Sequence, residues 1–275
     1  MDQKTLYDTI DPEILTRVNA RQEEISKGAS INSKLAAALA LGSIPVALAA
    51  LTKDVFAQAP SDVLDVLQFA LLLEQLEAEF YDRGVAASGL IDAGDMAIFA
   101  QIKAHEDAHV TAIQALITGK GATPNAKPTF DFTAHGAVAG FNFSAGQYET
   151  FKALAQAFED TGVRAYKGQA PRLINDKAVL TAALTIHAVE ARHASEIRRL
   201  RGLKGWITGA SRDDLPAFTQ GIYDGEDNVM QGGVDVSSLS LTASNGGVDA
   251  ATEAFDEPLT KAQVTAIVMP FIATS

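Results

Sequence analysis

Glu-Gln-Leu-Glu-Ala-Glu-Phe-Tyr, residues 74–81, lies in an otherwise apolar run, and part of its pattern recurs later in this 275-residue chain. Glu74 and Tyr81 are seven residues apart, and Glu159 and Tyr166 repeat that spacing. Seven residues make about two turns of an α-helix, so the carboxylate and the phenol of each pair share one helix face. The repetition indicates two copies of one structural unit.

A Glu-x-x-His motif follows each copy, at Glu106–His109 and at Glu190–His193. Glu106 lies 32 residues after Glu74, and Glu190 lies 31 residues after Glu159. Residues three apart on a helix point to the same side, so the glutamate and the histidine of each motif project together. The matched order and offsets predict two related helix pairs.

Apolar residues at spacings of three and four predict four long helices, beginning near residues 61, 92, 144 and 175 and ending near 84, 119, 168 and 200. The loop at residues 121–143 is long enough to carry the chain from one end of a bundle to the other. We therefore predict an all-α fold, with an antiparallel four-helix bundle over residues 60–205 and a crossover between the second and third helices. The expected helix caps are Ser61 or Asp62, Asp92 with Asp95, Ser144 with Gln147, and Asn175.

The repeated residues predict a metal site inside this bundle. If the two helix pairs face each other, four carboxylates and two imidazoles meet at the centre. Burying four ionised carboxylates without partners would cost several kcal/mol each, and two divalent cations would supply the counter-charge. Hard or borderline metals suit these donors, so we expect two Fe or Mn ions, a choice that the ligand types leave open. The expected metal ligands are Glu74, Glu106, His109, Glu159, Glu190 and His193.

An alternative is a bundle that keeps these residues but binds no metal. Its carboxylates would then be neutralised by hydrogen bonds or by protonation. Tyr81 and Tyr166 have three interpretations: they hydrogen-bond the carboxylates, take part in one-electron chemistry as catalytic residues, or fill the core with amphipathic side chains.

Two further glutamates lie close to Glu74 in the sequence. Glu77 and Glu79 have no acidic counterpart in the second copy, where Gly162 and Arg164 stand at the equivalent positions. We therefore expect both glutamates at the surface or behind the metal ligands.

Two histidines outside the motifs are weaker candidates. His187 lies one turn before Glu190 and is either an additional ligand or a satisfied core residue. His105 points about 100° away from Glu106, so we do not expect it to bind metal.

Composition excludes several kinds of site. The chain has 34 acidic and 22 basic residues and a net charge of -12, which argues against a nucleic-acid-binding surface. It contains no cysteine, so disulfides, thiolate catalysis and cysteine-bound clusters are excluded. A metal site must therefore use oxygen and nitrogen donors.

Residues 1–59 form a segment of different character. The uncharged stretch at residues 35–51 is rich in Ala, contains Gly42 and Pro45, and is shorter than the about 20 residues of a membrane span. Ala57-Gln58-Ala59 resembles a signal-peptidase site. The segment is either an export signal, which would make the protein periplasmic or exported, or a retained helix that packs on the domain or on a partner, in which case we expect a cytoplasmic protein.

The pattern of residues 206–275 predicts a C-terminal extension that contains loops, a hairpin and a short helix. Short alternating runs at residues 234–236 and 239–241 suggest a hairpin, and Thr260 with Gln263 predicts a capped short helix that ends near Pro270. We expect this extension to pack over one end of the bundle. Just before it, Arg198, Arg199 and Arg201 stand where positive charge complements a helix C-terminus, and a solvated helix end explains them sufficiently.

The order Glu, Glu-x-x-His, Glu, Glu-x-x-His, with a tyrosine two turns after the first glutamate, resembles the ferritin-like superfamily, which includes bacterioferritin and rubrerythrin. More narrowly, Gln68-Phe69-Ala70-Leu71 leading into residues 73–81, and residues 255–259 near the C-terminus, look like the bacterial ferritin-like domain family related to plant desiccation-related proteins. The resemblance covers about residues 60–200. It implies the six ligands named above and leaves the activity open.

Two departures from the wider superfamily matter. Cage-forming ferritins lack the polar N-terminal region and the long tail, so we do not expect a storage shell. Rubrerythrins carry a cysteine-bound electron-transfer module that this chain lacks.

We expect a redox or oxidative-stress protein that oxidises Fe(II) or consumes peroxide, with oxygen or peroxide as its co-substrate. The alternative is a metal-free or metal-stabilised structural protein linked to stress or desiccation. We expect a homo-oligomer or assembly through the N-terminal helix and the C-terminal tail.

Overall fold

Four long helices dominate the computed structural model, which describes residues 63–273. They are α4 (Val63–Ala86), α5 (Met96–Gly119), α6 (Tyr148–Gln169) and α7 (Lys177–Leu200). The all-α prediction is confirmed. The expectations for residues 1–59, including the export signal and the retained helix, lie outside the described residues.

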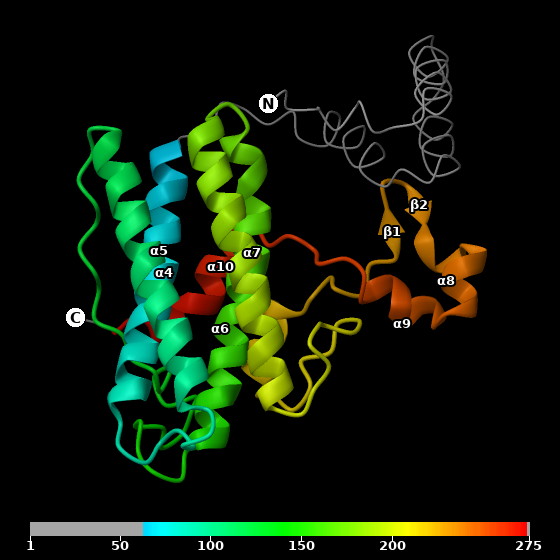
Figure 1. Ribbon diagram of the computed structural model, residues 1–275. Coiled ribbons are helices and arrows are strands. Elements are labelled where there is room, and N and C mark those ends of the chain that lie inside the picture. The colour runs from blue at the N-terminus through cyan, green and yellow to red at the C-terminus, as the bar shows by residue number, and fades with distance from the viewer. Residues whose placement is uncertain (1–62, 274–275) are drawn as a thin grey trace, which may run out of the picture. The chain divides into compact units, whose positions relative to one another are not determined.

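The helices form two antiparallel hairpins, α4 with α5 and α6 with α7. Helix α4 also packs against α6, and α5 against α7, which closes the bundle. Residues 120–147 connect the hairpins along the outside of the bundle, as Figure 1 shows. This is the predicted crossover.

Two apolar clusters fill the bundle. One contains Phe80, Phe151 and Phe158, with the Phe80 and Phe151 rings stacked at a centroid distance of 4.6 Å. The other is built around Leu71 and the apolar side chains of α5 and α7. Because Leu71 and Phe80 belong to different clusters, the polar residues between them on α4 are held between two apolar regions.

Only some of the predicted caps form. Asp176, rather than Asn175, caps α7 by accepting a hydrogen bond of 3.1 Å from the Val179 backbone N–H. Gln147 makes no cap bond; its side chain instead accepts from the Asn142 N–H at 2.8 Å in the preceding loop. Asp95 also makes no side-chain cap bond. The prediction for Gln147 was wrong because its side chain bonds the backbone of the preceding loop. The prediction for Asn175 was wrong because the cap lies one residue later.

The C-terminal extension is mostly short helices. They are η3 (Ala217–Ile222), η4 (Val236–Ser238), α8 (Ser240–Ser244), α9 (Gly247–Thr252), α10 (Lys261–Val268) and η5 (Met269–Phe271). Thr260 and Gln263 form the predicted capping box of α10.

The predicted hairpin is correct only in part. Strand β1 (Met230–Gln231) pairs antiparallel with β2 (Val234–Asp235), so residues 234–235 are indeed extended. Residues 239–241 are not a strand, because Ser240 begins α8. The Leu241 side chain is 76% exposed, so the alternation there does not mark a buried sheet face.

The tail packs along α4 and α6 through α10 and η5, whereas the packing on one end that was expected involves only its residues near Asp213, at the end of α7. Lys261 of α10 forms an ion pair with Asp65 near the start of α4, and the Phe271 ring lies 4.9 Å from that of Phe158. A methyl group added at Gly168 would lie 1.9 Å from the Leu259 carbonyl oxygen. The tail backbone therefore crosses α6 at a position that only glycine allows.

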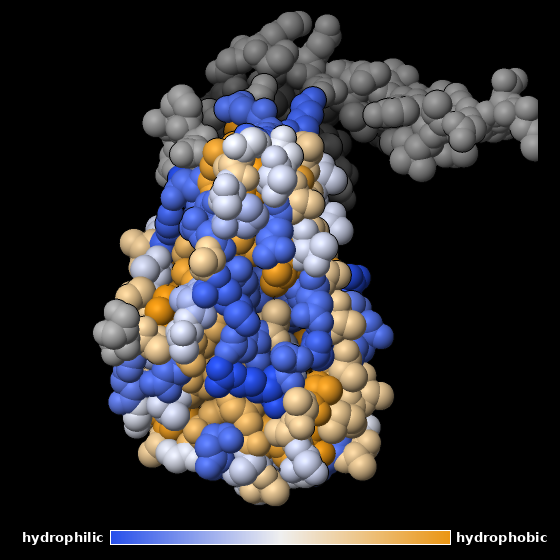
Figure 2. Space-filling model, turned by 90° about the vertical axis from the view of Figure 1, so that its left-hand side faces the viewer, coloured by the Kyte–Doolittle hydropathy of each residue, from blue (hydrophilic) through white to orange (hydrophobic). Residues whose placement is uncertain are grey.

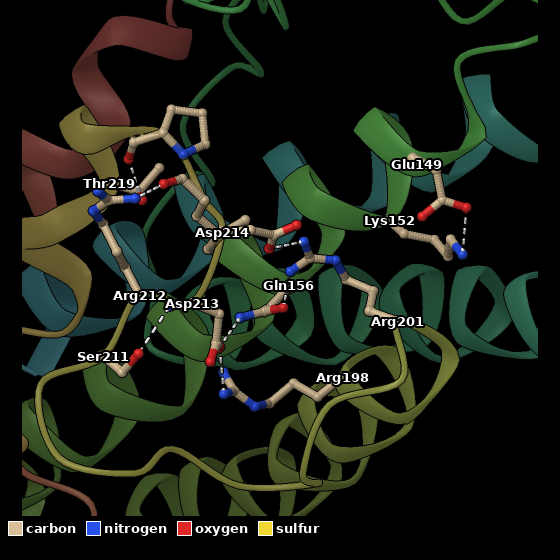
Figure 3. Close-up of polar contacts among 12 residues, drawn as sticks. Glu149, Lys152, Gln156, Arg198, Arg201, Ser211, Arg212, Asp213, Asp214 and Thr219 are labelled. Carbon is tan, nitrogen blue, oxygen red and sulfur yellow. Dashed lines mark hydrogen bonds and ion pairs between the residues drawn. The ribbon is translucent and has the colours of Figure 1, made fainter.

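The end of α7 is held by buried ion pairs. Arg198 lies 2.8 Å from both Asp160 and Asp213, and Arg201 bonds Gln156 and Asp214. Figure 3 shows Arg198 and Arg201 pointing toward the segment that carries Asp213 and Asp214. The expectation of a solvated helix end was wrong for these two arginines, because the tail brings acidic partners to it.

The exposed faces of the bundle are mixed in character. Figure 2 shows hydrophilic residues over much of one side, with apolar residues gathered toward its lower end. Within residues 63–273, no helix combines the length and the apolar character needed to cross a membrane.

Candidate metal centre

The structure brings all six predicted ligands together at the centre of the bundle. The four glutamates are completely buried, and His109 and His193 are 8% and 4% exposed. Their donor atoms form two overlapping groups, each with all atoms within 4.8 Å of one another. Glu106 and Glu190 belong to both groups. The first group is Glu74, Glu106, His109 and Glu190. The second group is Glu106, Glu159, Glu190 and His193.

Each histidine directs its Nδ1 atom at several carboxylates. The Nδ1 of His109 lies 3.1 Å from an oxygen of each of Glu74, Glu106 and Glu190. The Nδ1 of His193 lies 2.8 Å from Glu106 and 3.4 Å from Glu159. One donor nitrogen thus stands at the focus of each carboxylate group.

The two tyrosines link the repeats crosswise. Tyr81 on α4 donates a hydrogen bond of 2.5 Å to Glu159 on α6, and Tyr166 on α6 donates to Glu74 on α4. Burial, and then the negative charge of the bonded glutamate, holds the pKa of both phenols well above the ordinary value. The phenols therefore remain protonated donors that fix the two carboxylates.

Burial makes the ionised carboxylates unfavourable. It raises the pKa of Glu190 to about 8, with the charge of Glu74 as the next cause, and it raises the pKa of Glu74 to about 7. Burial opposes protonation of His109, but hydrogen bonds to three glutamates outweigh it and raise the pKa to about 12. Burial also opposes protonation of His193, but the charge of Glu159 and the hydrogen bond to Glu106 outweigh it and raise the pKa of His193 to about 11. Without metal, the site therefore retains protons.

The polar atoms of this site are incompletely paired. Among the described residues, seven buried side-chain N or O atoms lack a hydrogen-bond partner of acceptable geometry, and five of them belong to the site. Buried polar atoms are normally paired, so this cluster of unpaired ligand atoms is compatible with a site that holds a metal ion. Oxygen and imidazole donors converging on two centres fit two hard or borderline cations. The five atoms are Glu106 Oε1, Glu159 Oε2, Glu190 Oε1, Glu190 Oε2 and His193 Nδ1.

The profile of the ferritin-like domain family matches residues 62–203, which is more than half of the chain. The chain belongs to the ferritin-like domain family. No curated protein matches the sequence. The matched region contains all four long helices and all six predicted ligands.

The sequence left Glu77 either at the surface or behind the metal ligands of this ferritin-like domain, and the structure buries it close to Glu190 and outside both donor groups. Glu77 is only 3% exposed, whereas Glu79 forms ion pairs with Arg83 and Lys127. Gly162, which stands at the equivalent position in the second copy, lies close to Glu77 and leaves it space. The two copies therefore differ at this position, where one carries a buried carboxylate and the other carries glycine.

The histidines outside the motifs differ in position. In this ferritin-like domain, His105 Nδ1 lies 2.9 Å from His193 Nε2, and the two rings stack. Both line a groove of about 470 Å³ between α5 and α7. His187 belongs to neither donor group, and its Nδ1 is buried without a hydrogen-bond partner.

Proposed function

We propose that this ferritin-like protein holds two iron or manganese ions between its four long helices and uses them in redox chemistry, oxidising Fe(II) or consuming peroxide. The observation that carries the proposal is the pair of buried donor groups that share Glu106 and Glu190. Shared carboxylates are what a dinuclear carboxylate site requires. Such ions supply electron transfer and open coordination positions for oxygen or peroxide.

The residues divide into three roles under this proposal. Glu106 and Glu190 would contribute to the binding of both ions, since each belongs to both donor groups. Glu74 with His109 and Glu159 with His193 complete the two ligand sets. Tyr81 and Tyr166 would orient the outer carboxylates through their hydrogen bonds to Glu159 and Glu74.

The groove beside His193 favours a reacting site over a purely structural one. One nitrogen of His193 faces the carboxylates, and the other contacts His105, which lines the groove. A small substrate in this groove comes within one side chain of the ligands. A metal ion that only held the helices together would not need such a path.

The experiment combines metal analysis with turnover. Protein purified without chelator should contain two Fe or Mn ions per chain after anaerobic loading, and it should consume oxygen with Fe(II) or consume peroxide. Fewer than one metal ion per chain, unchanged by anaerobic Fe(II), would overturn the proposal.

A metal-stabilised structural or assembly protein is the second candidate, and the deep burial of all four glutamates favours it. In that case Glu190→Ala would lower the melting temperature of metal-loaded protein while the wild type shows no turnover. Assembly through the N-terminal segment and the C-terminal tail predicts an oligomer, and a monomeric full-length chain on size analysis would contradict it.

A further inference from the structure

Glu77 is a buried acidic residue that the six-ligand site does not use. It lies one turn after Glu74 on α4, so the two side chains share a helix face. Within residues 63–273, no ion pair joins Glu77 to a basic side chain, whereas Glu79 has two basic partners at the surface. An ionised carboxylate in such a position costs several kcal/mol unless a positive charge compensates it.

Gly162 brings Glu77 toward the metal centre. A methyl group placed on Gly162 would lie 3.3 Å from Glu77 Oε1 and 3.3 Å from Glu190 Oε2. The two carboxylates therefore lie on either side of a position that carries no side chain. Because Gly162 occupies in the second copy the position of Glu77 in the first, one copy supplies the carboxylate and the other supplies the space for it.

The surroundings of Glu77 are closed to solvent. Glu77 is only 3% exposed, and a cavity of about 10 Å³, roughly the space of one water molecule, is lined by Glu77, Thr161 and Val268 of α10. Burial, and then the charges of Glu190 and Glu159, raises the pKa of Glu77 well above its ordinary value. Since no lysine or arginine within residues 63–273 forms an ion pair with Glu77, a cation in the adjoining centre would compensate this carboxylate.

We propose that Glu77 is a fifth carboxylate ligand of the metal centre, on the Glu190 side, and that it favours trivalent over divalent ions. The inference rests on the proposed function and extends it. Four carboxylates balance two divalent ions when the imidazoles are neutral. A fifth negative charge is balanced when one ion becomes trivalent, so it stabilises the oxidised centre electrostatically.

The test compares Glu77→Gln with the matched control Glu79→Gln. Both changes remove one carboxylate and keep its size, but only Glu77 faces the centre. Mn²⁺ binding is measured by equilibrium dialysis, and the Fe(III)/Fe(II) ratio of iron-loaded protein is measured at fixed potential. We expect Glu77→Gln to weaken Mn²⁺ binding by about tenfold or more and to lower the Fe(III)/Fe(II) ratio by a similar factor. Glu79→Gln should match the wild type.

A second measurement separates a ligand from a structural residue. Because glutamine keeps the size of Glu77 and adds no charge beside Glu190, the metal-free Glu77→Gln variant should melt at the same or a higher temperature than the metal-free wild type.

The outcomes distinguish the two proposals. A wild-type chain that binds no metal would overturn both of them. A wild type that binds two ions, with a Glu77→Gln variant of equal Mn²⁺ affinity and equal Fe(III)/Fe(II) ratio, would overturn only the role of Glu77.

Discussion

At the scale of single residues, the site depends on hydrogen bonds that cross between the repeats. Tyr81 fixes Glu159 and Tyr166 fixes Glu74, so each helix of the α4–α6 pair orients a carboxylate of the other. Residues that orient ligands commonly influence metal affinity nearly as much as the ligands do.

Tyr81→Phe tests this coupling. The change leaves Glu159 without its phenol donor, so we expect Mn²⁺ affinity to fall by about tenfold and stability to fall by about 1.5–3 kcal/mol, the value of a hydrogen bond to a charged group. Calorimetric Mn²⁺ titration and urea denaturation measure the two effects. Tyr148→Phe is the control, because its hydroxyl bonds Asp95 outside the site. Wild-type Mn²⁺ affinity in Tyr81→Phe would contradict the account.

The ionisable residues also predict how stability depends on pH. In metal-free protein the pKa of Glu190 is raised to about 8, that of Glu74 to about 7, and that of His193 to about 11. The folded state then holds protons that the unfolded state has released, so the stability that these groups contribute falls as pH rises. The fall begins above about pH 4.5 for the glutamates and above about pH 6.5 for the histidines.

Metal binding must displace those protons, so metal affinity should rise with pH over the same range. Urea denaturation at pH 5.5 to 8.5, with chelator and with Mn²⁺, measures both effects. If the stability of the protein in chelator increased from pH 5.5 to 8.5, the site would not hold the protons assigned to it.

At the scale of helices, the sequence pattern predicted the features that depend on residues close together in the chain. The four long helices follow from apolar spacing, and the shared faces of Glu106 with His109 and of Glu190 with His193 follow from a spacing of three. The ion pairs of Arg198 could not be predicted, because its partner Asp213 reaches it through a loop that no periodicity describes. The burial of Glu77 also depends on a contact between helices, which the sequence of α4 alone does not encode.

Gly168→Ala tests the crossing of the tail over α6. The added methyl group would collide with the Leu259 carbonyl, so we expect a loss of about 1–3 kcal/mol in the free energy of unfolding as the tail shifts. Gly119→Ala is the matched control, since no atom lies within 4 Å of a methyl group there, and it should be neutral or stabilising. Equal stability of the two variants would mean that the tail does not pack on α6 at this position.

At the scale of the whole molecule, two hairpins of similar sequence create one site that neither hairpin contains. Each donor group draws ligands from three of the four long helices, so the site forms only when the hairpins pack together. The equivalence of the repeats predicted the six converging residues. It could not predict Glu77, which is acidic in one repeat and replaced by glycine in the other.

The central claim is that two metal ions occupy the centre of the bundle. The most direct measurement is an anomalous difference map from crystals of Mn²⁺-loaded or Fe²⁺-loaded full-length protein. The account predicts two peaks about 3.5–4 Å apart, both within coordination distance of Glu106 and Glu190. A map from fully loaded crystals with no peak between these two carboxylates would contradict it.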